Sequence, residues 1–250
     1  RCWPLGIEVA KMVECTTIEE VGSTGVGAMT LAFLIFIVST VVFVFKANNG
    51  GETRKYYYCT SYICGFAAIS YLGMLSGQGW LATTGCRQFF YARYIDYAIT
   101  TNITILLLGL LSGASTELIA GAVGADFAWI GAAFLGSVSV VSEVKWLWFF
   151  INIGALIIVS HHIVVLFKAA AEAKGGEVAQ LYGKLVWLTF LCWICYPVVW
   201  LFSEGFASFS ISFEVCAYAL IDVASKVGLS FMVMSANDVI AAGGEGTEFV

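Results

Sequence analysis

The sequence predicts an all-α membrane protein that folds as a bundle of seven transmembrane helices, and three observations support this fold class. Of its 250 residues, 60% are hydrophobic and only 12% are charged, whereas soluble domains are about 45–50% apolar and about 25% charged. The apolar residues gather in seven blocks, each close to the ~20 residues that a helix needs to cross a bilayer. Segments of roughly ten residues with alternating polarity, which a membrane β-barrel would require, do not occur in the sequence.

The seven blocks follow one another along the chain, separated by short breaks that are polar or rich in glycine. The predicted helices cover residues 24–46, 56–77, 90–112, 117–140, 145–168, 183–203 and 211–236. The breaks between them read, in order, KANNGGETRK, GQGWLATTGCRQ, SGAST, VSEV, AAAEAKGGEVAQ and SEGFASFS. Seven packed helices leave no room for a second core, so we expect one domain, 24–236, between an N-terminal segment, 1–23, and a C-terminal tail, 237–250.

The positively charged side chains predict the orientation of the bundle, because cytoplasmic loops carry an excess of lysine and arginine. The first and fifth breaks fall on the same side of the membrane and are flanked by Lys46, Arg54, Lys55, Lys168, Lys174 and Lys184. We therefore expect an extracellular N-terminus, a cytoplasmic C-terminus and a multi-pass protein of the plasma membrane. The formal net charge of −5 argues against nucleic acid as a partner, and the expected partner is the lipid bilayer.

The eight cysteines do not predict a metal site or a disulfide framework. Five of them lie in apolar blocks, where a cysteine usually acts as a small hydrophobic residue: Cys59, Cys64, Cys192, Cys195 and Cys216. None of these has a histidine at the spacing of a zinc site. Cys2, Cys15 and Cys86 lie in polar segments on the expected outer side, so two of these three could form one disulfide.

Two ionisable residues, Asp222 and Lys226, lie one helical turn apart in the last apolar block. At this spacing they share one face of the helix, and a lysine near mid-span cannot easily reach the membrane surface. Ionisable residues inside a span usually mark a functional site; a purely structural ion pair is the alternative. Because a buried amine is a nucleophile toward aldehydes, Lys226 could form a Schiff base with Asp222 as counter-ion.

The third block places a second carboxylate on one helix face. Arg93, Asp96 and Thr100 are spaced three and four residues apart, so their side chains point in the same direction. A positively charged nitrogen on Lys226, held by Asp96 and Asp222 together with Arg93, would leave a nearly neutral cluster. Such pairing is what buried charges require.

Five stretches, in the right order, resemble helix motifs of the microbial rhodopsins, a family of seven-helix retinal-binding proteins. They are YLGMLSGQG for the second helix, RYIDYAITT for the third, VGADFAWIG for the fourth, WICYPVVWLFSEG for the sixth and LIDVASKVG for the seventh. The resemblance covers nearly the whole chain. It implies all-trans retinal as the cofactor, attached to Lys226 through a protonated Schiff base.

The resemblance also implies roles for the residues around the chromophore. Asp96 would be the primary counter-ion and proton acceptor, with Asp222 the second acid and Arg93 on their extracellular side. The remaining predicted contacts are Tyr71 and Tyr196 to the second acid, Thr100 orienting the first, and Trp193, Pro197 and Trp200 packing on the chromophore. Thr101 and Asp126 would form a structural hydrogen-bonded pair. Glu204 and Glu214 match two acids associated with proton release, although they could instead be solvated loop residues.

The sequence departs from the family pattern at several positions that bear on function. Leu107 occupies the place of the proton donor, an acid in outward pumps, and a leucine cannot donate a proton. Asn102 replaces a usual proline, and the neutral polar Thr104 lies on the same helix. The chromophore pocket is altered at four further positions, which are Tyr97, Trp129, Phe149 and Ser225.

These departures leave three functions open, none of them enzymatic. A light-gated anion channel is the favoured prediction, because the donor is absent, the polar residues near the path are neutral, and some non-algal anion channelrhodopsins of protists share this pattern. A light-driven outward proton pump with slow reprotonation is the first alternative, supported by the extracellular acids. A sensory rhodopsin is the second. The transported ion would be chloride or a proton, and relatives suggest a homo-oligomer.

Overall fold

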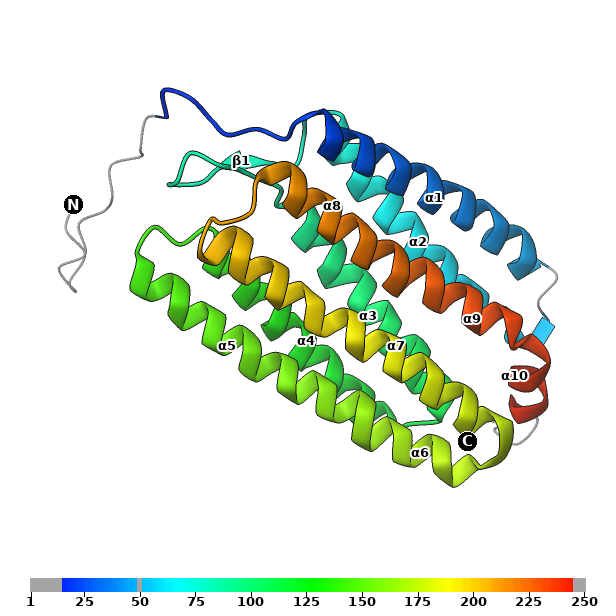
Figure 1. Ribbon diagram of the computed structural model, residues 1–250. Coiled ribbons are helices and arrows are strands. Elements are labelled where there is room, and N and C mark those ends of the chain that lie inside the picture. Colours follow the sequence, from blue (N-terminus) through cyan, green and yellow to red (C-terminus); the bar gives the residue numbers. More distant parts are fainter. Residues whose placement is uncertain (1–14, 49–50, 245–250) are drawn as a thin grey trace.

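The computed structural model describes residues 15–48 and 51–244 and consists of long helices that lie side by side (Figure 1). Within these ranges, seven helical spans are long and apolar enough to cross a membrane, which confirms the predicted fold class.

Spans one to four are α1 (Ser23–Asn48), α2 (Arg54–Leu75), α3 (Ala92–Ser112) and α4 (Thr116–Ser137). Span five joins α5 (Ser142–His161), the π-helical η2 (His162–Leu166) and α6 (Phe167–Lys174), and span six joins α7 (Gly176–Trp200) and the π-helical η3 (Leu201–Gly205). Span seven consists of α8 (Ile211–Asp222), the π-helical η4 (Val223–Gly228) and α9 (Leu229–Ser235).

The remaining elements are short and lie at the two ends of the bundle. At one end, β1 (Leu81–Ala82) and β2 (Gln88–Phe89) form a hairpin between spans two and three. At the other end lie the 3-10 helix η1 (Gly51–Thr53) and helix α10 (Asn237–Gly244). Figure 1 shows the hairpin and α10 at opposite ends of the molecule, and we refer below to the hairpin end and the α10 end.

Spans five and six are longer than the sequence predicted. Span five contains 33 residues and span six 30, and the predicted break at 169–180 is helical on both sides of Gly175. The prediction failed because alanine, glutamate and lysine are strong helix formers, so that polarity alone does not end a helix. Gly175 and Gly176, with φ of 74° and 62°, provide the reversal. At 1.5 Å per residue, 33 residues measure about 50 Å, so span five extends beyond the ~30 Å apolar core of a bilayer.

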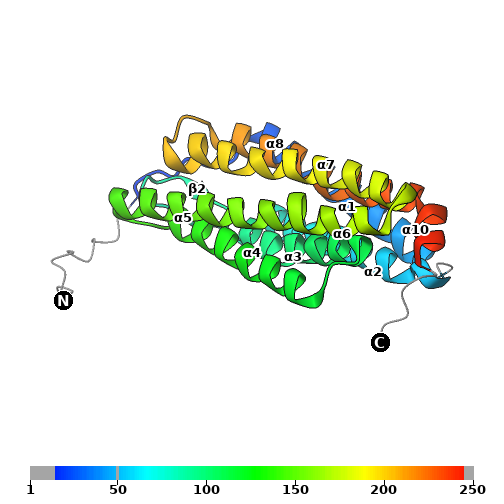
Figure 2. The same cartoon turned by 90° about the horizontal axis from the view of Figure 1, so that it is seen from below.

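The seven spans pack in a closed ring, and span three is the member that lies deepest inside the bundle. Each span contacts the next along the chain, and α8 returns to α1; Figure 2 shows the layers of this arrangement from below. Helix α3 is the most buried of the seven and also contacts α6 and α7. Large apolar side chains on the outside of the ring are exposed, as expected for contact with lipid: Leu31, Val38, Phe45, Ile69, Leu147, Phe150, Ile157, Leu191 and Leu220.

Three short π-helical segments interrupt the spans, and the sequence did not predict them. A π-helical turn inserts an extra residue and often occurs at functional positions. The segment η4 contains Lys226, and η3 contains Glu204. Two of the three segments therefore shift the direction of side chains for which the sequence predicted a function.

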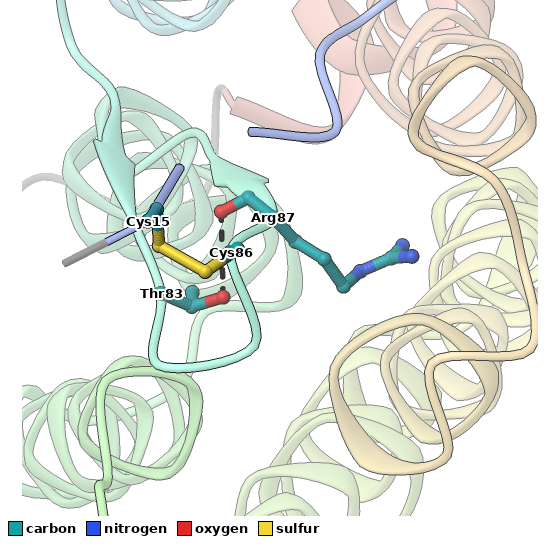
Figure 3. The surroundings of a disulfide bond; sticks show 4 residues. All are labelled: Cys15, Thr83, Cys86 and Arg87. Atoms are coloured by element: carbon teal, nitrogen blue, oxygen red, sulfur yellow. Dashed lines mark hydrogen bonds between the residues drawn. A yellow bond between two sulfur atoms is a disulfide. The ribbon is translucent and has the colours of Figure 1, made fainter. Parts of the chain in front are cut away.

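A disulfide ties the start of the described chain to the hairpin. Cys15 bonds Cys86 with a Cα–Cα distance of 5.5 Å, and Thr83 donates to the carbonyl of Arg87 beside it (Figure 3). Glu19 pairs with Arg87 in a parallel bridge, so the N-terminal segment runs along the hairpin. Two of the three candidate cysteines thus form the disulfide, and Cys2 lies outside the described residues.

Candidate functional site

The amine of Lys226 is buried in the middle of the bundle between two carboxylates. The residue is 4% exposed, and its Nζ donates to Asp96 Oδ2 from α3. The same nitrogen lies 3.4 Å from Asp222 Oδ1, one turn earlier in span seven. The sequence spacing predicted the second contact, which lies within one helix, while the first depends on how spans three and seven pack. Together they balance the lysine's charge with two acids.

Phenol groups surround the carboxylate of Asp222. Tyr71 donates to its Oδ2 and Tyr196 to its Oδ1, both at 2.7 Å, as the family motifs predicted. Tyr97 adds a third, longer contact of 3.4 Å to Oδ2. By contrast, Asp96 Oδ1 is buried and has no hydrogen-bond partner among the described residues. The negative charge on Asp222 is therefore the better stabilised of the two.

Ser225, next to Lys226, lies at the edge of this phenol network. Its Oγ is 3.1 Å from the hydroxyl of Tyr196 and 3.3 Å from the carbonyl of Asp222. Serine in a membrane helix often bonds only the preceding turn, but this side chain also contacts span six. Ser225 therefore lies beside Tyr196 and Asp222, close to Lys226, where the sequence placed its hydroxyl.

Within the described part of the chain, Arg93 forms its ion pair with a third acid and not with the two acids around Lys226. Its Nη1 forms an ion pair with Glu214 Oε1 at 2.9 Å, and its guanidinium lies 4.1 Å from the ring centre of Tyr218. The reason is that α8 brings both residues to the hairpin side of α3, where the arginine finds a nearer carboxylate. Arg93 thus belongs to a second charged cluster, one step outward from Lys226.

The two threonines of the third helix differ in what they contact. Thr100 donates to the backbone carbonyl of Asp96 at 2.9 Å, because a threonine hydroxyl in a helix readily reaches the carbonyl one turn back, and its side chain also interacts with the carboxyl group of Asp96. Thr101 Oγ1 lies 2.6 Å from Asp126 Oδ2, the predicted pair, and 2.6 Å from the carbonyl of Tyr97. Since a hydroxyl has one hydrogen, Thr101 shares it between these two acceptors.

An aromatic cavity lies next to the lysine cluster. Its walls include the predicted residues Tyr97, Trp129, Tyr196, Pro197 and Trp200. Trp193 packs on Trp129 with ring centres 5.2 Å apart, and Phe149 stacks on Trp200 at the same distance. Tyr97 also approaches Lys226, whose Nζ is 4.9 Å from the centre of its ring. Tyr97 and Tyr196 therefore join the cavity to the buried amine.

Four residues of this region were missed by the sequence reasoning. Tyr94 and Tyr218 line the cavity, Ser137 accepts from Trp200 Nε1 at 2.7 Å, and Asn152 donates to the carbonyl of Trp129 at 2.8 Å. Tyr218 stands four residues before Asp222, so helix periodicity could have identified it. Asn152 is a polar residue in an apolar block, which is also a usable signal.

The half of the bundle between Lys226 and the α10 end is apolar at the position of the missing donor. Leu107 is fully buried in a cluster with Ile105, Leu108 and Leu111. Thr104 donates to the carbonyl of Thr100, so its hydrogen bond stays within its own helix.

Asn102, the residue at the position of the usual proline, also bonds within its own helix. Its Nδ2 donates to the carbonyl of Ala98 at 2.7 Å, while its Oδ1 is buried without a described partner. In the part of the chain that the structure describes, neither Asn102 nor Thr104 donates a hydrogen bond to another span.

The two acids near the hairpin end are both buried. Glu204 is 9% exposed and Glu214 is 1% exposed, so the alternative that they are solvated loop residues is wrong. Lys145 donates to the backbone carbonyl of Glu204 at 2.8 Å, and Glu204 also lies within electrostatic range of Glu214 and Arg93. A buried group of two acids and an arginine can hold and pass protons if water or other polar groups connect it to the surface.

The site combines features that fit the covalent capture of an apolar aldehyde. A primary amine is held away from water between two carboxylates, and a cavity with aromatic walls adjoins it. A cation formed at the lysine nitrogen would be balanced by the two acids, and Asp96 Oδ1, which has no partner within the described ranges, could accept a further hydrogen bond.

Comparison with known proteins agrees with this arrangement. Residues 25–240 match the model of the family described as bacteriorhodopsin-like protein. The chain is 30% identical over 224 residues to bacteriorhodopsin of Haloterrigena sp. (strain arg-4), covering 86% of each sequence. Its fold is similar to a thermophilic rhodopsin from Rubrobacter xylanophilus, with a TM-score of 0.85 and 32% identity over 89% of this chain and 100% of the other. It is also similar to a light-driven proton pump from Leptosphaeria maculans, with a TM-score of 0.86 and 28% identity over 91% and 99%.

The match to the family model spans most of the chain, and the relatives are covered over most of their length. Members of this family are integral membrane proteins that bind retinal as their chromophore. The chain therefore belongs to the bacteriorhodopsin-like family of microbial rhodopsins, the retinal-binding proteins of light-driven ion transport.

Proposed function

We propose that this protein is a light-driven proton pump that moves protons outward, with retinal attached to Lys226 through a protonated Schiff base. The observation that carries the proposal is the direct contact of the Lys226 amine with Asp96, an acid whose second oxygen has no hydrogen-bond partner among the residues that the structure describes. Retinal, when bound, supplies the light-absorbing polyene and the aldehyde that condenses with the lysine with loss of water. The residues Tyr97, Trp129, Pro197 and Trp200 would hold it in the aromatic cavity.

Asp96 is the better proton acceptor of the two acids beside Lys226. Tyr71 and Tyr196 each donate a short hydrogen bond to Asp222, so both oxygens of that carboxylate already accept a hydrogen from a phenol. Asp96 lacks comparable bonds from phenols and touches the lysine nitrogen directly. A proton that leaves Lys226 Nζ therefore goes to Asp96, while Asp222 keeps its charge.

The expected orientation makes this movement outward. The positive residues that flank the α10 end predict that this end is cytoplasmic. Arg93, Glu214 and Glu204 then lie between Lys226 and the extracellular side. A proton accepted by Asp96 therefore has the charged cluster of Arg93, Glu214 and Glu204 ahead of it in that direction.

Asn102, Thr104 and Leu107 led the sequence analysis to favour an anion channel, but their contacts in the structure support a channel less well. Asn102 and Thr104 direct their hydrogens to carbonyls of their own helix, and Leu107 lies in a fully apolar cluster. A conducting path would need polar groups that face a common lumen. The missing donor remains important, because it means that the proton returns to the lysine nitrogen from water and therefore slowly.

Electrical recording on an expressing cell tests the proposal. Under voltage clamp, a pump gives an outward photocurrent at every voltage, whereas an anion channel gives a current that reverses at a potential following chloride. The first result is expected, and the second would establish the channel instead. A protein that absorbs light but carries no current would be a sensor, which also refutes the pump.

Lys226→Ala tests the attachment site separately. Without the amine no Schiff base can form, so we expect the visible absorption band to disappear completely from the purified protein. Lys184→Ala, at the α10 end of span six, is the matched control and should keep the band. A visible band that persists in Lys226→Ala would show that retinal is held by another group.

A further inference from the structure

A row of alternating charges leads from Arg93, inside the bundle, to the surface at the hairpin end. Arg93 Nη1 is 2.9 Å from Glu214 Oε1, Arg87 Nη2 is 3.9 Å from Glu214 Oε2, and Arg87 Nη1 is 2.6 Å from Glu19 Oε2. The side chains become progressively more exposed along this row, from 3% and 1% for the inner pair to 13% and 44% for the outer pair. We call these four residues the exit row.

Arg87 contacts two segments that are distant in sequence, the loop before α8 and the N-terminal segment. Its Nη2 donates to the carbonyl of Phe209 at 2.7 Å, in the loop that precedes α8. Glu19, its partner in the N-terminal segment, accepts a hydrogen bond through Oε1 from the backbone N–H of Ile211 at 3.3 Å. Figure 3 shows the arginine side chain extending away from the disulfide. Arg87 thus reaches from the hairpin across the hairpin end of span seven.

The disulfide links the two segments that carry Glu19 and Arg87, the outer pair of the exit row. Cys86 immediately precedes Arg87, and its carbonyl accepts from the N–H of Glu19 at 2.8 Å. Its disulfide with Cys15 attaches the N-terminal segment, which contains Glu19, to the hairpin, which contains Arg87. The ion pair between Glu19 and Arg87 is therefore fixed by backbone hydrogen bonds and by a covalent link.

We propose that Arg87 is a positioning residue for proton release, holding the outer oxygen of Glu214 while Arg93 holds the inner one. The disulfide-bonded N-terminal segment keeps Arg87 in this position through Glu19. Glu214 Oε2 is buried and has no hydrogen-bond partner among the described residues, so its ion pair with Arg87 is its outer support. This inference rests on the proposed function, because it assigns two further residues to the exit of the same pathway.

The charge balance explains why an outer cation matters during transport. When a proton moves from Lys226 to Asp96, both become neutral, and Arg93 is then attracted by Asp222 as well as by Glu214. Arg87 is not affected by that change and continues to stabilise the charged form of Glu214. Besides the exit row, the described ionisable groups that interact with Glu214 are Glu204 in η3, Tyr94 on α3 and Tyr218 on α8, and none of them adds positive charge.

Arg87→Gln tests the proposal in the retinal-bound protein in lipid nanodiscs. A laser flash starts transport, and a water-soluble pH dye times the appearance of the proton in the bulk. Glutamine removes the positive charge, so Glu214 holds a proton more tightly, and we expect release to be delayed ~10-fold, which corresponds to about 1.4 kcal/mol. The absorption maximum should not change, because Arg87 touches none of Lys226, Asp96 and Asp222.

Two companion variants separate positioning from a general loss of structure. Arg87→Lys keeps the charge and should restore most of the wild-type timing, which a merely structural role of the guanidinium would not predict. Arg54→Gln removes an exposed arginine that contacts backbone carbonyls at the α10 end and should release protons with wild-type timing. Glu19→Gln leaves Arg87 in place but removes its outer ion pair, so it should give a smaller delay in the same direction.

The outcomes distinguish this inference from the proposed function. Wild-type timing in Arg87→Gln, in a protein whose wild type releases protons, would overturn the role of Arg87 and leave the pump intact. A wild type that releases no protons after the flash would overturn the pump and the inference with it. If Arg87→Gln does not bind retinal, Glu19→Gln becomes the test, and unchanged release in that variant would refute the proposed support of Arg87.

Discussion

Replacing Leu107 with aspartate restores an acid at the place where the donor is missing. Leu107 stands eleven residues after Asp96 on the same helix, which places it about 16 Å toward the α10 end. Its side chain is fully buried among leucine and isoleucine residues. An aspartate there enters as the neutral acid, because burying its charge without a partner is very costly. The variant therefore carries a proton at the depth from which Lys226 must be reprotonated.

The magnitude follows from the source of the proton. If water reprotonates the lysine nitrogen in the wild type, the rate falls about tenfold for each unit of pH increase, and a positioned acid typically accelerates proton transfer by ~10²–10⁴-fold. We expect Leu107→Asp to recover at least ~10²-fold faster at pH 8 and to lose most of its pH dependence. The loss of leucine volume and the buried carboxyl should cost about 2–5 kcal/mol of stability.

Flash photolysis between pH 6 and pH 9 measures the recovery, and Leu107→Asn is the matched control. Asparagine has nearly the same size and polarity as aspartic acid but cannot donate a carboxyl proton, so its recovery should remain slow and dependent on pH. Equal acceleration by both variants would indicate that added polarity or water, not the acid, sets the rate. A wild-type recovery that is already independent of pH would refute the reasoning, because it would reveal an internal donor.

Two further predictions concern the stability of the buried networks, measured as the temperature at which the retinal-bound protein loses its visible band. Arg93→Gln leaves Glu214 buried without its 2.9 Å partner and should cost about 3–5 kcal/mol, whereas Arg54→Gln should cost less than about 0.5 kcal/mol; similar melting of the two variants would contradict the ion pair. Thr101→Val removes the 2.6 Å partner of Asp126 and should cost about 1–3 kcal/mol, while Thr101→Ser should retain most of the stability. Wild-type stability in Thr101→Val would mean that Asp126 finds another partner.

Contacts within one helix could be predicted from the sequence, and contacts between helices could not. The pairing of Lys226 with Asp222 follows from a separation of four residues on one helix, and the structure has this contact. The ion pair of Arg93 with Glu214 could not be predicted, because Glu214 lies on another span and no spacing along the chain relates the two. Family motifs supplied Tyr71 and Tyr196 as partners of Asp222, but Tyr97 became a third only through the packing of α3 against span seven.

The sequence by itself determined seven membrane spans, a lysine and two acids at membrane depth, and the absence of a donor acid at Leu107. These features are local, since hydrophobic length and helical periodicity depend on neighbouring residues alone. Only the tertiary structure decided that Cys15 pairs with Cys86, that π-helical turns redirect the segments around Lys226 and Glu204, and that Arg87 meets Glu214. Each of these depends on the rotation and relative depth of whole helices, which are set by the sum of many packing contacts between segments far apart in the chain.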